Sequence, residues 1–169
     1  FFCGQMADAH RLSRAVRTRP MDLETEALSA LLDFWYEGQH GPVDGPGSHL
    51  AKVVDLLMRR GSAELWLRCI PRVYMFISRP GVSAQIQRLV LGARSAAGDG
   101  HGSLQATANV VEGWLMLWKC RLAELQATFR NIEADARWLG QPEALRTQLL
   151  TLKINYQVAC DDKDAVCAT

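Results

Sequence analysis

Histidine is the first residue type to consider for chemistry, because it serves as a metal ligand and as a general base. His40 and His49 border a glycine- and proline-rich stretch that contains Asp44, whereas His10 and His101 stand apart from it. A zinc site usually takes four ligands, two of them from one short motif, and no cysteine lies near this stretch. We therefore expect neither a metal site nor a bound cofactor.

Two other segments contain residue types that occur in ligand sites. Residues 160–164 include three carboxylates, but they lack the glycine and the bidentate glutamate of a calcium loop. Residues 98–102 are rich in glycine, but no strand precedes them and no Gly-Lys-Ser/Thr follows, as a phosphate loop requires. The chain also lacks the Gly-x-Ser-x-Gly and His-Glu-x-x-His motifs. We expect a protein without a catalytic site, ending in a polar tail from about residue 161.

Arginine forms a basic concentration near the beginning of the chain. Arg11, Arg14, Arg17 and Arg19 fall within residues 9–21, where no acidic residue occurs. On a helix they predict a basic face that contacts phosphate groups, RNA or an acidic partner. The alternative is a purely structural role, in which these arginines pair with the acidic residues at the start of the next predicted helix.

Composition excludes several classes of protein. The 19 basic and 18 acidic side chains give a formal net charge of +1, and 49% of the residues are hydrophobic. This balance excludes a disordered chain and argues against extensive wrapping around nucleic acid. The sequence has no uncharged apolar stretch of about 18 residues, so we expect no membrane-spanning segment. Five scattered cysteines favour an intracellular location, in the cytoplasm or inside an organelle. Because transit peptides are rich in arginine and poor in acidic residues, the arginine-rich beginning leaves a mitochondrial or plastid location as an alternative.

Apolar residues recur at helical spacing between clear breaks, and strand-like alternation is hard to find. The pattern predicts one all-α domain over residues 1–169, an irregular bundle of about six or seven helices. Flexible loops are expected near residues 38–48 and 98–102. A degenerate helical repeat is the alternative, although no fixed period is visible.

Local signals set several helix boundaries. Ser48 is the predicted N-cap of a helix that reaches about Arg60. Gly61 predicts the end of that helix, and Ser62 predicts the cap of the next. Pro71 predicts a kink or a fresh start in the segment that follows.

The longest pattern is a row of apolar residues spaced alternately three and four apart, which predicts one continuous helix over about 104–139. Before Lys119 the other faces are also apolar, so that half must be surrounded. After Lys119 they become polar, so the second half lies at the surface. The last predicted helix, from Pro142, can cover only the nearer part of the row.

The part of the apolar row that the last helix cannot cover would be exposed in a single chain. It therefore favours a non-catalytic structural or adaptor subunit of a larger assembly, bound to other subunits or to itself. Each large apolar side chain left exposed forgoes about 1.5–3 kcal/mol, so a shared interface is favoured. The alternative is a helical nucleic-acid-binding module that uses the arginine face, and a third is a ligand pocket between helices. The predicted interface residues are Trp118, Leu122, Leu125, Phe129, Ile132 and Trp138.

Overall fold

The computed structural model is all-helical in the residues it describes, which are 2–17, 20–41, 45–71, 73–98, 100–134 and 140–161. No strand occurs in these ranges, which confirms the predicted all-α class. The elements are α1 (Phe2–Val16), α2 (Leu23–His40), α3 (Gly45–Arg60), α4 (Ala63–Cys69), the 3₁₀ helix η1 (Val73–Phe76), α5 (Val82–Ala97), α6 (Gly102–Trp118), α7 (Leu122–Ala134) and α8 (Glu143–Ala159).

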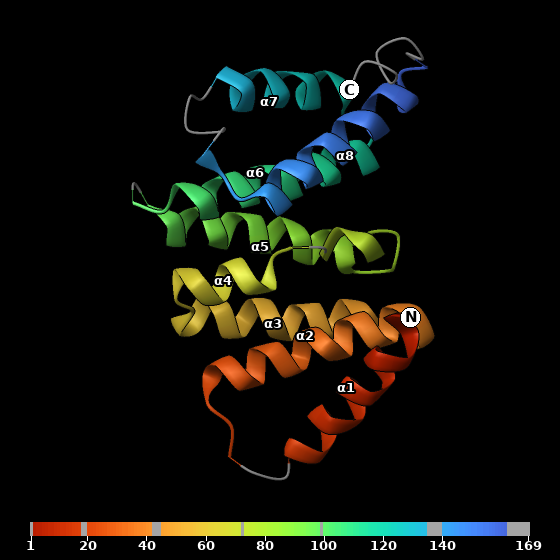
Figure 1. The fold of residues 1–169 in the computed structure, drawn as a ribbon, viewed down its shortest axis with the longest axis vertical. Helices are drawn as coiled ribbons and strands as arrows, with labels where there is room; N and C mark the ends of the chain where they lie inside the picture. Colours follow the sequence, from red (N-terminus) through yellow and green to blue (C-terminus); the bar gives the residue numbers. More distant parts are fainter. Residues whose placement is uncertain are drawn as a thin grey trace.

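The helices are stacked in layers along the long axis of the molecule (Figure 1). α1 lies at one end, followed by α2 and α3, then α4 and α5, then α6, with α7 and α8 at the other end. Elements that follow each other in the sequence mostly pack on each other, as α2 does on α3 and α5 on α6. The arrangement is an all-helical bundle, and the degenerate helical repeat that the sequence left as the alternative stays a prediction.

Two apolar cores hold the layers together, and α6 belongs to both. The first extends from α2 to α6 and contains Phe34 and Trp66 among its buried side chains. The second lies between α6, α7 and α8, with Leu125 and Leu152 fully buried. α6 turns Val111 toward the first core and Val110 toward the second. The prediction that this half of the apolar row is surrounded is therefore confirmed.

The predicted single helix over 104–139 is wrong, because the chain turns after α6. Cys120 has a left-handed backbone with φ of 55°. Its N–H donates to the Leu117 carbonyl at 3.0 Å, and the Arg121 N–H donates to the Met116 carbonyl at 2.9 Å. These two bonds form a Schellman motif, which ends a helix by satisfying its last carbonyls. The apolar pattern continues across the turn because α7 buries its own row in the second core.

The loop predicted near 38–48 is much shorter than expected. α2 continues to His40, and α3 begins at Gly45, before the predicted N-cap Ser48. Ser48 lies inside the helix, where its hydroxyl donates to the Gly45 carbonyl at 2.8 Å. Pro46 is compatible with this earlier start, since the first turn of a helix needs no N–H from it.

Other boundaries follow the prediction. The Ser62 hydroxyl accepts a hydrogen bond from the Leu65 N–H at 3.2 Å and so caps α4. α4 ends just before Pro71, and η1 is the fresh start after it. The connection near 98–102 is also present, between α5 and α6. The polar tail predicted from about 161 lies outside the described residues, except for Asp161.

Candidate functional site

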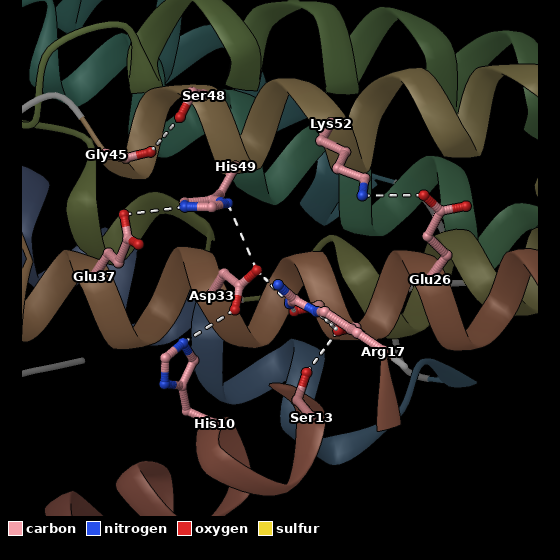
Figure 2. Close-up of polar contacts among 11 residues, drawn as sticks. His10, Ser13, Arg17, Glu26, Asp33, Glu37, Gly45, Ser48, His49 and Lys52 are labelled. Atoms are coloured by element: carbon pink, nitrogen blue, oxygen red, sulfur yellow. Dashed lines mark hydrogen bonds and ion pairs between the residues drawn. The ribbon is translucent and has the colours of Figure 1, made fainter. Parts of the chain in front are cut away.

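A buried carboxylate, Asp33, is the centre of a polar cluster where α1, α2 and α3 meet (Figure 2). The residue is only 4% exposed. The guanidinium of Arg17 donates to its Oδ2, and His10 Nε2 and His49 Nδ1 lie 3.2 and 3.7 Å from its Oδ1 and Oδ2. A carboxylate is costly to bury unless it is paired. The bond from Arg17 to Oδ2 therefore compensates part of the burial, whereas Oδ1 accepts no hydrogen bond within the described residues and has the His10 ring nitrogen beside it.

His49 links the cluster to a second carboxylate. Its Nε2 lies 3.0 Å from Glu37 Oε2, one turn further along α2 from Asp33. The ring of His49 thus stands between two carboxylates, with one ring nitrogen toward each (Figure 2). This arrangement fixes the start of α3 against the second half of α2.

Helical spacing brings the α1 and α2 members of the cluster onto facing surfaces. Residues seven apart, with one between them, share one face of a helix. We call this contact the polar seam. Its members are His10, Ser13 and Arg17 from the first segment, and Ser29, Asp33 and Tyr36 from α2.

The polar seam is held by hydrogen bonds and one aromatic stack. The Ser13 and Ser29 hydroxyl oxygens are 2.6 Å apart, and Arg17 Nε donates to Ser29 Oγ at 2.9 Å. The ring of His10 stacks on Tyr36 with centroids 4.0 Å apart and planes 5° apart. No side chain between residues 7 and 15 is buried. In the part of α1 whose side chains are described, polar contacts therefore replace an apolar core.

The pairing of His10 with Asp33 resembles the way enzymes orient a general base. Such a base needs a nucleophile within hydrogen-bond reach. The nearby hydroxyls of Ser13 and Ser29 bond to each other, and Ser29 also accepts from Arg17. Within the described residues, neither hydroxyl is paired with His10. The cluster thus lacks the geometry of a nucleophile–base pair.

An open depression of about 520 Å³ lies beside the polar seam. Ala7, His10, Arg11 and Arg14 line it from α1, and Tyr36 lines it from α2. His10 contributes an edge to this depression while its Nε2 faces Asp33. The depression is thus the exposed side of the buried cluster.

The predicted basic face is divided by the geometry of the helix. Arg17 turns inward to Ser29 and Asp33, whereas Arg11 and Arg14 line the depression. A step of three residues turns a helix by about 300°, so two steps place Arg17 about 120° from Arg11. Arg19 lies outside the described residues.

Three of the predicted interface residues are buried inside the chain itself. Leu125, Phe129 and Ile132 belong to the second core, together with residues of α6 and α8. The ring of Phe129 meets that of Tyr156 edge to face, with centroids 5.4 Å apart. The inference that the chain has too little left to cover the apolar row is therefore wrong, because α6 and α8 cover it.

The other predicted interface residues have different surroundings. Leu122 is half-buried at the start of α7, and Trp118 is exposed at the end of α6. Trp138 lies outside the described residues. Of the predicted set, Trp118 is thus the large side chain that the structure shows open to a partner.

The sequence analysis missed a second apolar row, on the outer face of α8. Leu150, Ile154 and Val158 are 46%, 37% and 62% exposed. The inner face of the same helix buries Leu149 and Leu152 in the second core. One signal was visible in the sequence, since residues 147–159 contain Lys153 as their one charged residue. A helix with solvent on one side normally carries more charge there.

In the described part of the chain, no group of three or more His, Cys, Asp or Glu is arranged to hold a metal ion. No helix of that part is long and apolar enough to cross a membrane. A comparison of the chain with protein-family models, curated proteins and solved structures finds no match. The molecule is thus defined by its own features, a helical stack with a polar seam at one end and an exposed apolar row at the other.

Proposed function

We propose that the chain is a non-catalytic structural or adaptor subunit, and that its first assembly contact is with a second copy of itself through the outer face of α8. The observation that carries this is the exposed row Leu150, Ile154 and Val158, in a stretch of α8 (147–159) whose one charged residue is Lys153. α8 lies in the last layer of the stack (Figure 1). Stacked helical proteins need a polar outer face on their terminal layers to stay single in water.

The spacing of the row suits packing of α8 on another α8. Side chains four apart form a ridge along a helix, and two such ridges pack into each other's grooves. When two copies meet antiparallel about Ile154, Leu150 of one copy faces Val158 of the other. Thr151 and Gln157 border the row without charge. The contact therefore brings no like charges together, and charged residues are typically depleted at the centre of an interface.

The overall charge also permits self-association. A formal net charge of +1 gives little repulsion between two copies. The row is short, however, and association must first offset about 4–15 kcal/mol of lost translational and rotational freedom. We therefore expect a weak dimer, with a dissociation constant on the order of micromolar.

Sedimentation velocity across the micromolar range tests this proposal. The sedimentation coefficient should rise with concentration, and Ile154→Glu should abolish the rise while leaving the helix content unchanged by circular dichroism. Leu91→Glu is the matched control, because Leu91 is exposed on α5 and outside the proposed contact. A monomer at every concentration would contradict the proposal, as would a dimer that Ile154→Glu leaves intact.

The nucleic-acid alternative has weaker support. It needs a continuous basic surface that follows a phosphate backbone. Arg17 is paired with Ser29 and Asp33, which leaves Arg11 and Arg14 as the arginines of the described N-terminal region that have no partner on another helix. Two adjacent cations suit a single phosphate group better than a strand.

A further inference from the structure

We infer that the depression between α1 and α2 binds one phosphate monoester group, a function separate from the proposed dimer contact. The depression is open to solvent and measures about 520 Å³. That space holds a phosphate together with a small organic group, such as a phosphorylated side chain. Three side chains that carry N–H donors, His10, Arg11 and Arg14, line it together with Tyr36.

The two arginines are available to a ligand. Arg14 is exposed and makes no hydrogen bond or ion pair with the described residues, and Arg11 pairs with Asp8 on its own helix. Both members of that pair are exposed, and exposed pairs of this kind are weak. Arginine also matches phosphate geometry, because its planar fork donates two parallel hydrogen bonds.

The buried cluster orients the third donor. Asp33 lies 3.2 Å from His10 Nε2, so the second ring nitrogen of His10 points away from Asp33 (Figure 2). Stacking on Tyr36 fixes the plane of the ring. The imidazole thus presents Nδ1 as the donor to an anion in its protonated form. Asp33 acts here as a positioning residue.

The arrangement favours a phosphate monoester over a nucleic acid or a carboxylate. Three side chains with N–H donors line one depression, and a monoester offers three terminal oxygens to them, whereas a carboxylate offers two. A nucleic acid would need further cations along a track, but Arg17 beside the site is already paired with Asp33. The ligand would also contact the residues that hold α1 on α2, and its binding should therefore strengthen the polar seam.

Isothermal titration calorimetry of the full chain with phenyl phosphate, inorganic phosphate and acetate tests the inference. We expect phenyl phosphate to bind more tightly than inorganic phosphate, and acetate not to bind. Arg14→Gln should weaken phenyl phosphate binding at least tenfold. Arg59→Gln is the matched control, since Arg59 is an exposed arginine on α3, away from the depression, and it should leave the affinity unchanged.

A second measurement separates binding at this site from general attraction of anions. The imidazole ¹⁵N signals of His10 should shift during the titration, and those of His101 should not. Three results would overturn the inference: no binding, equal binding of acetate, or an Arg14→Gln variant with unchanged affinity. Binding of an RNA oligonucleotide that phenyl phosphate fails to displace would also overturn it, in favour of a nucleic-acid surface.

Discussion

The two ends of the helical stack are attached by opposite kinds of contact. α1 is held on α2 through the polar seam, and no side chain between residues 7 and 15 is buried. α8 is held by Leu145, Leu149 and Leu152, all buried in the second core. Hydrogen bonds exchange for bonds to water and stabilise little in net terms, whereas apolar burial contributes directly. The comparison predicts that α8 belongs to the folded core, and that α1 separates from the stack more easily than α8 does.

The outward faces of the two ends differ in the same sense. α1 presents Arg11 and Arg14 to solvent beside one apolar side chain, Leu12, whereas α8 presents a row of three, Leu150, Ile154 and Val158. A charged face attracts ions and ionic groups, and an apolar face is covered most favourably by protein. The stack therefore has one end suited to an anion and the other suited to a second chain.

The largest expected effect is at the α8 end. Leu152→Ala should lower the free energy of unfolding by about 2–5 kcal/mol, because it empties a fully buried position in the second core. Leu150→Ala, two residues away on the exposed face, should change it by less than about 0.5 kcal/mol. Urea unfolding at a dilution below the proposed association measures both. Equal effects would show that the two faces of α8 are not different.

The next effect concerns the polar seam. Asp33→Asn should lower stability by about 1–3 kcal/mol, since it leaves Arg17 and His10 without their carboxylate. The loss is less than for a fully buried pair, because the Arg17 side chain is 35% exposed and water can replace its partner.

Hydrogen exchange locates the effect of this substitution. The amides of α1 should lose their protection in Asp33→Asn, while those of α8 keep theirs. Asp8→Asn is the control, because it removes an exposed pair with Arg11 and should leave α1 protected. Uniform loss of protection along the whole chain would contradict a separable α1.

A third effect lies in the first core and depends on pH. Burial, assisted by the charge of Glu24, raises the pKa of the Cys69 thiol from 9.0 to about 12. The unfolded thiol ionises above pH 9 while the folded one keeps its proton. The stability contributed by this protonated thiol is therefore complete below pH 9 and is lost as the pH rises toward 12.

Comparison of the natural chain with Cys69→Ala isolates this contribution. Between pH 8 and pH 10, the free energy of unfolding of the natural chain should fall by about 1.4 kcal/mol more than that of the variant, because the variant has no thiol at this position. Urea unfolding of both proteins at pH 8 and pH 10 measures the difference. Parallel changes in the two proteins would show that Cys69 ionises normally in the fold.

Much of the fold was predictable because its signals are local. The Ser62 cap and the fresh start after Pro71 each depend on a few neighbouring residues. The polar cluster was not predictable in the same way. Asp33 on α2 pairs with Arg17 from the end of the first segment and lies beside His49 from α3. Only the packing of these three parts of the chain brings the side chains together.

The break between α6 and α7 shows a different limit. No glycine or proline marks it, and the apolar row passes through it without interruption. Apolar residues spaced alternately three and four apart are compatible with one long helix. They are equally compatible with two helices that each bury their apolar residues in one core. The pattern alone therefore did not distinguish an exposed ridge from a covered one.

The smallest expected effect tests that break directly. Cys120 adopts a φ of 55°, which disfavours any residue with a Cβ atom, and glycine is free of this penalty. Cys120→Gly should therefore raise the free energy of unfolding by about 0.5–1 kcal/mol after the greater freedom of the unfolded chain is taken into account. Cys120→Val should lower it, because a β-branched residue is poorly tolerated there. Thermal unfolding measures both variants. A destabilised glycine variant would instead favour a continuous helix, and with it an exposed apolar row in place of the one that α6 and α8 cover.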